Sequence, residues 1–429
     1  MKNLVIVIIT LLTLASCHKK QDSLKVTDLN DYEKFLKSDS NQIKKVMTEV
    51  RFWSDRLDND STDINALSEL ASANTTLFNV SGKIEYLKIA EQLWKEGIEH
   101  ATIEKTSLLR SLAHNYIVQH EFKKAKQILN KAFLISKERE TVFMFFDVHM
   151  ELGNYEAAKD ALFKVKDLSD FNYLVRLAKW MKHKGYVNNN TFKYLRRAVK
   201  LAEAGALKHE MNWSYSNLAD YYSDAGKIEK AYHYYLKALE VNPNDNYALK
   251  KIAWMVFSYE KNAEIAYMIL NRIKEKYESP DIYLMEAEIA AYEKDFDKKA
   301  KSTEAYYKLL NRKSYGEMYN AHNALLYIDK QKDFQKAITI AKREIKNRPT
   351  PQSYDLLAWA YYNQGDYNKA FQITKEFIHG KTFKPETLYH QAKILKANAK
   401  NKRVKSIKRE LKNSLFELGP NFSEKINAL

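Results

Sequence analysis

Three features of the sequence predict an all-α solenoid, that is, an array of stacked helix pairs. The prolines follow a step of roughly 35 residues or its double, and such a fixed period is typical of repeated supersecondary units. They are Pro243, Pro280, Pro349, Pro351, Pro385 and Pro420. The chain has only 10 Gly and 6 Pro in 429 residues and little strand-like alternation, which favours helices throughout. The third feature is one spacing of small and bulky residues that recurs along the chain.

The recurring spacing is a pair of alanines twelve residues apart, each with bulky residues nearby on the same helical face. The alanine pairs are Ala113 and Ala125, Ala219 and Ala231, and Ala358 and Ala370. Small residues on two antiparallel helices let the backbones approach closely, while neighbouring Leu and Tyr side chains fill the space beside them. Tyr222, Tyr235 and Tyr361 are therefore predicted core residues. Gly153, Gly226 and Gly365 lie five residues before an alanine, where a positive φ would suit the turn between two helices.

On these residues the chain resembles tetratricopeptide repeat proteins. The resemblance is specific in segments 106–137, 139–166, 212–245 and 351–382, fair in 246–279 and 316–349, and weak in 29–60, 63–100, 170–204, 281–312 and 385–419. It implies a right-handed superhelix of about eleven helix pairs. We expect degenerate pairs over 29–104, beginning with a pair formed by Leu29–Lys37 and Gln42–Leu57, the main solenoid over 105–419 and a tail at 420–429.

The N-terminus has the pattern of an export signal. A short basic start is followed by the apolar run Leu4–Ala15, which is too short to span a bilayer comfortably. The run ends in Leu14-Ala15-Ser16-Cys17, which resembles a bacterial lipobox. The resemblance implies that residues 1–16 are removed, that Cys17 is acylated and that 17–28 form a tether. The alternatives are an ordinary signal peptide or an anchor helix.

Charge and cysteine content narrow the functional classes. The formal net charge is +16, and for an exported protein we expect acidic envelope proteins, anionic glycans or headgroups as partners rather than nucleic acid. The stretch 393–412 carries nine Lys or Arg and one Glu, and it is either a binding surface or a solvated helix face. Cys17 is the single cysteine, so no intrachain disulfide or cysteine zinc site is available.

No motif predicts catalysis, a cofactor or a metal site. Gly380-Lys381-Thr382 resembles the end of a phosphate-binding loop, but Lys375 stands where the upstream glycine is needed. His209-Glu210 lacks a second histidine at Trp213, so the helical zinc pattern is incomplete. We therefore expect a protein that is not an enzyme.

The resemblance also implies a binding surface, because in tetratricopeptide proteins the first helix of each pair lines the concave face. The residues that this places on the concave face are Arg110, His114, Phe143, Asp147, Trp213, Asp220, Asp224, Trp359, Tyr362 and Asn363. Aromatic side chains beside carboxylates and amides suit a peptide or helix laid in a groove. The alternative is that these residues are simply exposed on the first helices.

These observations predict a non-catalytic scaffold or adaptor, lipid-anchored in the cell envelope at the outer membrane and facing the periplasm. Its partner would be a protein or peptide in the concave groove, with no evident small-molecule substrate. The alternative is a nutrient- or glycan-binding lipoprotein that partners an outer-membrane transporter. Such proteins hold ligands with long loops rich in Gly, Asn and Trp, for which this chain has little room.

Overall fold

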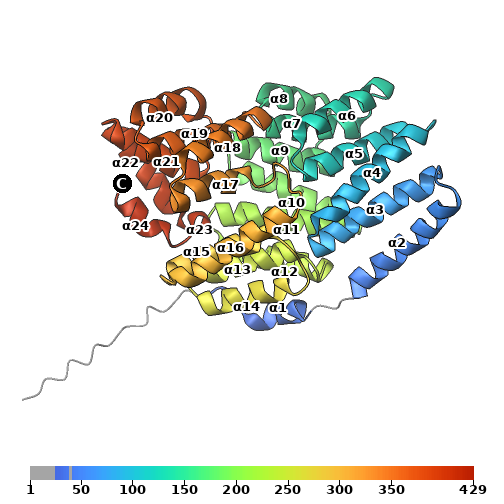
Figure 1. Ribbon diagram of the computed structural model, residues 1–429, viewed down its shortest axis with the longest axis horizontal. Coiled ribbons are helices and arrows are strands. Elements are labelled where there is room, and N and C mark those ends of the chain that lie inside the picture. Colours follow the sequence, from blue (N-terminus) through green and yellow to red (C-terminus); the bar gives the residue numbers. More distant parts are fainter. Residues whose placement is uncertain (1–24, 38–40) are drawn as a thin grey trace, which may run out of the picture.

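The structure is a computed structural model that describes residues 25–37 and 41–429. Its described residues are almost entirely helical and include no β-strand, as the sequence predicts (Figure 1). The signal run 1–16, Cys17 and most of the tether lie outside the described residues.

Most of the described helices form antiparallel pairs of consecutive helices. The pairs are α3 with α4 (Ile64–Ser81, Ile84–His100), α5 with α6 (Lys105–Val118, Phe122–Ile135), α7 with α8 (Arg139–Glu151, Tyr155–Lys164), α9 with α10 (Phe171–His183, Asn189–Ala204), α11 with α12 (Lys208–Asp224, Ile228–Val241), α13 with α14 (Asn246–Ser258, Ala263–Lys274), α15 with α16 (Pro280–Tyr292, Phe296–Arg312), α17 and the π-helical turn η1 with α18 (Asn320–Leu326, Tyr327–Gln331, Phe334–Asn347), α19 with α20 and the π-helical turn η2 (Pro351–Gln364, Tyr367–Ile373, Thr374–Ile378), and α21 with α22 (Pro385–Ala397, Asn401–Asn413).

The repeat residues have the roles that their spacing predicts. All six alanines of the three alanine pairs are fully buried, and Tyr222, Tyr235 and Tyr361 lie in the core. Prolines begin α15, α19 and α21 at the first helical turn, where the missing N–H has no cost. The turn glycines 153, 226 and 365 have φ values of +70°, +69° and +97°.

The N-terminal helices depart from the predicted pairing. The helix α1 (Leu29–Leu36) buries Tyr32 and Phe35 against α12 and α14 instead of pairing with α2 (Asn41–Asn59). Just before α1, the side chain of Glu260 accepts hydrogen bonds from the backbone N–H groups of Val26 and Thr27. The helix α2 packs along α3. The expected pair of Leu29–Lys37 with Gln42–Leu57 is therefore wrong, because Glu260 and the apolar surface of α12 and α14 bind α1 far from its sequence neighbours.

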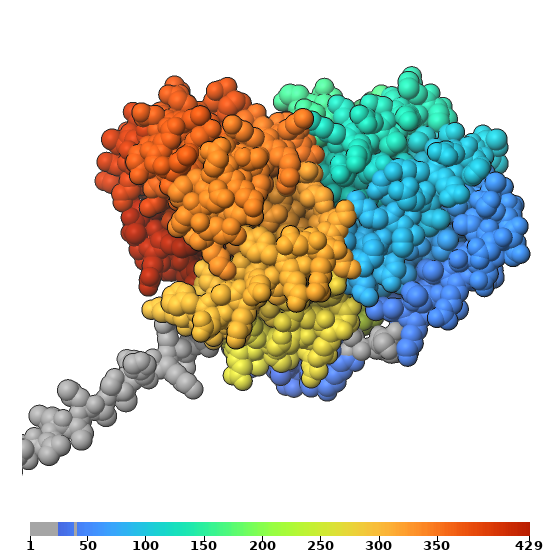
Figure 2. Space-filling model, viewed as in Figure 1, coloured from blue at the N-terminus to red at the C-terminus, as the bar shows by residue number. Residues whose placement is uncertain are grey.

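The helix pairs wind into a superhelix that makes more than one turn, so that later pairs lie against earlier ones (Figures 1 and 2). Contacts between the two turns join positions roughly 200 residues apart: the Glu278 N–H donates to the Ser81 carbonyl at 2.7 Å, Gly153 touches Pro349, and Gly185 touches Phe383. In Figure 2 the orange surface of the second turn meets the blue and teal surface of the first. We call these contacts the inter-turn interface.

Candidate binding cavity inside the superhelix

The superhelix surrounds a cavity of about 1630 Å³ that is partly open to solvent, which we call the central cavity. Its wall on one side comes mainly from the first helices of four consecutive pairs, α5, α7, α9 and α11. The opposite wall comes from the second superhelical turn, through Arg348, Thr350 and Gln352 and through residues 382–385. Ser414 and Glu417, near the C-terminus, complete the lining.

Seven of the ten residues predicted for the concave face line the central cavity. They are Arg110, His114, Phe143, Asp147, Trp213, Asp220 and Asp224. They come from three first helices of the first turn, α5, α7 and α11, which the fold brings around one space. Their role in binding stays a prediction.

The other three residues, Trp359, Tyr362 and Asn363, do not line the central cavity. Trp359 is only 7% exposed and is stacked between His390 and Tyr362, with ring centroids 4.1 and 5.0 Å away. Asn363 donates a hydrogen bond to the Trp359 carbonyl within α19. The helix α21 of the next pair supplies His390 and covers this part of α19, so the concave-face placement of Trp359 is corrected to the core.

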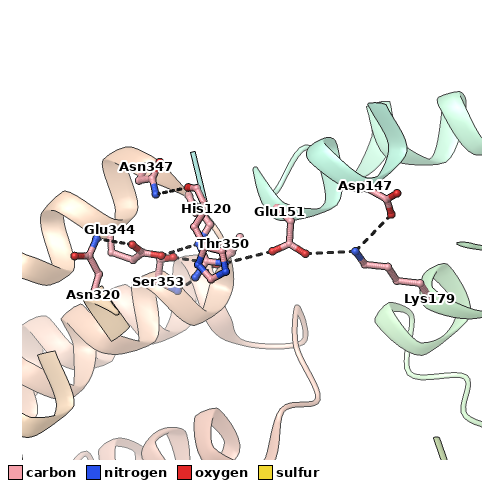
Figure 3. A network of polar contacts seen from close by, with 10 residues as sticks. His120, Asp147, Glu151, Lys179, Asn320, Glu344, Asn347, Thr350 and Ser353 are labelled. Carbon is pink, nitrogen blue, oxygen red and sulfur yellow. Dashed lines mark hydrogen bonds and ion pairs between the residues drawn. The ribbon is translucent and has the colours of Figure 1, made fainter. Parts of the chain in front are cut away.

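A network of ion pairs crosses the cavity wall from the first turn to the second (Figure 3). Lys179 Nζ on α9 lies 3.4 Å from Glu151 Oε1 and 3.7 Å from Asp147 Oδ1, both carboxylates belonging to α7. Glu151 also faces Arg348 of the second turn, with Oε2 3.3 Å from Nη1. Arg348 then binds Glu344, whose carboxylate is buried, at 2.7 Å. This network joins the wall of the cavity to the inter-turn interface.

Other charged side chains on the wall are paired in the same way. Arg176 binds Asp147 at 2.7 Å, and Arg110 and Lys182 form ion pairs with Glu138 and Asp224. Asp220 accepts hydrogen bonds from Tyr235 at 2.6 Å and Tyr247 at 2.5 Å, and it lies 3.1 Å from Lys251 Nζ. Most charges on the wall are therefore already neutralised by neighbours, and a ligand would meet a polar surface without a strong excess of either sign.

Burial and neighbouring charges change the ionisation of side chains that line the cavity. Burial opposes the charge on Lys179, yet Asp147 and Glu151 hold the pKa of its ammonium above the ordinary value. Burial lowers the pKa of His114, although the ring itself faces open space in the cavity. Burial and then the nearby Asp224 raise the pKa of Glu417. His114 is thus a neutral donor and acceptor near neutral pH, and Lys179 stays charged.

Trp213 is the large aromatic side chain of α11 that remains accessible in the cavity. It is 42% exposed, and its ring meets Phe171 edge to face at a centroid distance of 6.1 Å. Asn217, one turn further along α11, donates to the Trp213 carbonyl and also lines the cavity. An exposed indole supported by a second ring is a suitable anchor for an apolar side chain of a partner.

Sequence reasoning did not find the wall contributed by the second turn. Arg348, Thr350, Phe383 and Glu417 line the cavity, yet they lie in loops or near the C-terminus, outside the first helices of the repeats. The prolines at 349, 351 and 385 mark these loops as boundaries between repeats. The sequence carries no signal for the positions that these loops contact roughly 200 residues earlier.

The remaining predictions concern features away from the cavity. In the basic stretch 393–412, Lys396 and Lys408 donate to the carbonyls of Ala428 and Asn427, at 2.9 and 2.6 Å, and so hold the end of the chain. Within the described residues, no group of three or more His, Cys, Asp or Glu side chains is arranged to hold a metal ion. None of the helices over 25–37 and 41–429 combines the length and hydrophobicity needed to cross a membrane.

Two segments match family models described as tetratricopeptide repeat, residues 213–245 and residues 351–376. They coincide with the pairs α11/α12 and α19/α20, in which the repeat spacing is clearest. No curated protein has a matching sequence.

Several solved structures match this chain at low sequence identity and low TM-score. A tetratricopeptide repeat protein from Parabacteroides merdae is 12% identical, with 57% of this chain and 92% of that chain covered and a TM-score of 0.38. Yeast Tom70 is 15% identical, with 87% and 97% covered and a TM-score of 0.38. A human IFIT1 dimer with m7Gppp-AAAA is 13% identical, with 79% and 95% covered and a TM-score of 0.45. With the helix pairs described above, the two family-model matches show that this chain carries tetratricopeptide repeats within an α-helical solenoid.

Proposed function

We propose that this protein is a non-catalytic interaction scaffold that holds an extended peptide segment of a partner protein in the central cavity. Tetratricopeptide repeats generally serve protein–protein interaction, which supports this class of function. The observation that carries the proposal is the cavity itself. At about 1630 Å³ it exceeds the roughly 300–1,000 Å³ that is typical of small-molecule sites, and one side of it is built mainly from the first helices of four consecutive pairs.

The chemistry of the wall favours a peptide over a strongly charged ligand. Asp147, Glu151 and Asp224 already neutralise the basic side chains beside them, so a polyanion would have to break those ion pairs. The neutral His114 and Asn217 can exchange hydrogen bonds with a peptide backbone, and Trp213 can anchor one apolar side chain. The net charge of +16 therefore does not make this cavity a polyanion site.

The anchoring part of the proposal rests on the sequence alone. We propose that Cys17 is acylated after cleavage of residues 1–16, and that the lipid holds the solenoid at the outer membrane on the periplasmic side. The motive is the apolar run Leu4–Ala15 directly before Leu14-Ala15-Ser16-Cys17. Residues 17–28 would then separate the lipid from α1.

The peptide-binding role is tested with a photo-reactive amino acid at two positions in intact cells. One replaces Asn217 in the central cavity, and the other replaces Leu134, which is 86% exposed on α6, a second helix outside the cavity. We expect a crosslinked partner from position 217 that is lost when Trp213→Ala is added, and no such product from position 134. Equal crosslinking from both positions, unaffected by Trp213→Ala, would contradict binding in the cavity.

The anchoring is tested separately with Cys17→Ser. We expect the wild type to incorporate labelled fatty acid and to fractionate with the membrane, and the variant to do neither. Labelled lipid on the Cys17→Ser protein would rule out acylation at this residue.

A further inference from the structure

The concave surface continues beyond the central cavity, and there the chain covers it with its own C-terminal segment. Residues 414–421 include the short helix α23 (Leu415–Leu418), which packs against α11 and α13, both first helices of their pairs (Figure 1). Ser414 and Glu417 of this segment line the end of the central cavity. The segment therefore lies where an extended ligand of the groove would continue past α11.

Both the main chain and the side chains of the segment hold it in place, and Leu418, 7% exposed, packs into the apolar cluster of α21 and α22. The Phe416 carbonyl accepts one hydrogen bond from Trp254 Nε1 at 3.0 Å and a second from Ser258 Oγ at 2.7 Å, both from α13. Asn421 donates to the carbonyl and to the carboxylate of Glu288 on α15, at 2.9 and 2.8 Å. Recognition of a main-chain carbonyl depends on the path of the backbone rather than on the side chain, so Trp254 and Ser258 can serve any peptide that follows this path.

Two features of the segment fit the groove more specifically. The Phe416 ring meets Tyr259 edge to face at 6.5 Å. Gly419 has φ +84° and ψ 163°, a region open essentially to glycine, and a Cβ atom there would lie 2.9 Å from Trp254 Cη2. An aromatic residue followed three positions later by a glycine is thus the pattern that the groove accepts.

One charged side chain of the segment, Glu417, has no ion-pair partner in the groove. Glu417 forms no ion pair with any described residue, and the carboxylate of Asp224 on α11 is a close like charge. Burial and this like charge raise the pKa of Glu417, while the positive charges of Lys182, Lys384 and Lys251 act in the opposite direction.

We propose that the groove of α11, α13 and α15 is a second peptide-binding site, which residues 414–421 occupy in the free protein. Its partner is a peptide segment with an aromatic residue followed three positions later by glycine, and it binds by displacing residues 414–421. This site adjoins the central cavity, but Trp254, Ser258 and Glu288, which bind the segment, lie outside the cavity lining, so the proposal stands without the proposed function.

The test uses the full-length protein and a fluorescein-labelled synthetic peptide that copies residues 412–423. A tethered segment acts at an effective concentration of about the millimolar range, so the wild type should bind the free peptide only weakly. Gly419→Ala should free the segment without altering the groove, and we expect it to bind the peptide at least tenfold more tightly than the wild type. Gly380→Ala is the matched control, because Gly380 has φ +73° with open space around it, and it should behave as the wild type.

Two further variants, Trp254→Phe and Asn421→Ala, test binding in the groove and release of the segment separately. Trp254→Phe removes a donor from the groove, so added to Gly419→Ala it should abolish the gain in peptide binding. Hydrogen exchange of residues 414–424 reports whether the segment is released, and Asn421→Ala provides a second route to release. If either variant exposes the segment and the peptide still does not bind, the segment is only a structural cap and the proposal is wrong. If both variants leave the segment protected, its displacement by a partner is equally excluded.

Discussion

The turns between paired helices fall into two groups, those that face solvent and those that meet the second superhelical turn. Gly226 has φ +69°, and a Cβ atom there would touch nothing within 4 Å. Gly82 has nearly the same φ, +71°, but a Cβ atom there would lie 2.0 Å from the Glu278 carbonyl oxygen. The two positions therefore differ in their surroundings and hardly at all in φ.

Residues other than glycine adopt the same left-handed turn elsewhere in the molecule. Lys261, Lys294 and Lys332 have φ values of 60°, 61° and 55° between the helices of their pairs. The turn itself thus tolerates a side chain, at a cost of about 1–2 kcal/mol. At Gly82, Gly153 and Gly185 the decisive requirement is the close approach of Glu278, Pro349 and Phe383. The comparison shows that some repeat glycines are there for contacts between superhelical turns.

The largest expected effect comes from adding one methyl group at the inter-turn interface. Gly82→Ala should cost more than about 3 kcal/mol of stability, or separate the two turns locally, because backbone atoms of Glu278 occupy the space of the new Cβ. Gly226→Ala, the matched control, should cost only the turn conformation, about 1–2 kcal/mol. Thermal unfolding measures the stability, and small-angle scattering measures any opening of the superhelix. Equal losses in the two variants would mean that the inter-turn contact at Gly82 carries no free energy.

A smaller effect is expected from the ionic part of the same interface. Arg348→Met keeps an unbranched aliphatic side chain but removes the positive charge beside Glu344. The Glu344 side chain is only 1% exposed, and Asn320, at 2.8 Å, then remains as its side-chain partner. We expect a loss of about 2–3 kcal/mol, because removing one partner of a buried ion pair leaves an uncompensated charge.

The matched variant Glu151→Gln removes the ion pair across the interface and the ion pair with Lys179, but it leaves Arg348 beside Glu344. The side chains of Arg348 and Glu151 are both partly exposed. Glu151→Gln should therefore lower the stability by less than about 1 kcal/mol, and this loss should shrink at high salt. Urea unfolding at low and high ionic strength measures both variants. If Glu151→Gln costs as much as Arg348→Met, the buried Glu344 is not the reason for the effect.

The helix pairs were predictable because their signals are local. The alanine spacing, the turn glycines and the N-terminal prolines each act within one repeat, and the structure confirms their roles. The pairing of α1 and the wall formed by the second turn were not predictable, because they depend on contacts roughly 200 residues apart that no periodic pattern encodes.

Contacts that the repeat pattern does not encode also limit the prediction of single residues in the candidate site. His114, Asp220 and Trp359 each directly follow the first alanine of a repeat pair, so they share one register position on their helices. His114 and Asp220 line the central cavity, whereas His390 from α21 covers Trp359. The repeat register determines which way a side chain faces, but the neighbouring units determine whether that face is open.

The smallest predicted effect tests a contact between neighbouring repeats, where pH rather than salt should matter. Asp355 on α19 and His390 on α21 are both buried, with Oδ2 and Nδ1 2.9 Å apart. Burial opposes a charge on His390, but the carboxylate of Asp355 raises the pKa of the imidazole above its ordinary value. Burial also raises the pKa of Asp355, so the folded pair retains a proton that the unfolded chain releases.

A raised folded-state pKa contributes stability that is complete below the unfolded value, about 6.5 for histidine, and is lost as pH rises through the folded value. The stability of the wild type relative to Asp355→Asn should therefore fall by about 1 kcal/mol between pH 6 and 9. The difference in stability between the wild type and Asp355→Asn reports the contribution of the Asp355–His390 pair alone. The other histidines with shifted pKa values, such as His114, His120 and His183, titrate in both proteins and cancel. Urea unfolding at each pH gives this difference, and Glu151→Gln, which alters the inter-turn interface, should show no such trend. A relative stability that stays constant or rises with pH would show that the imidazole of His390 is neutral in the folded protein.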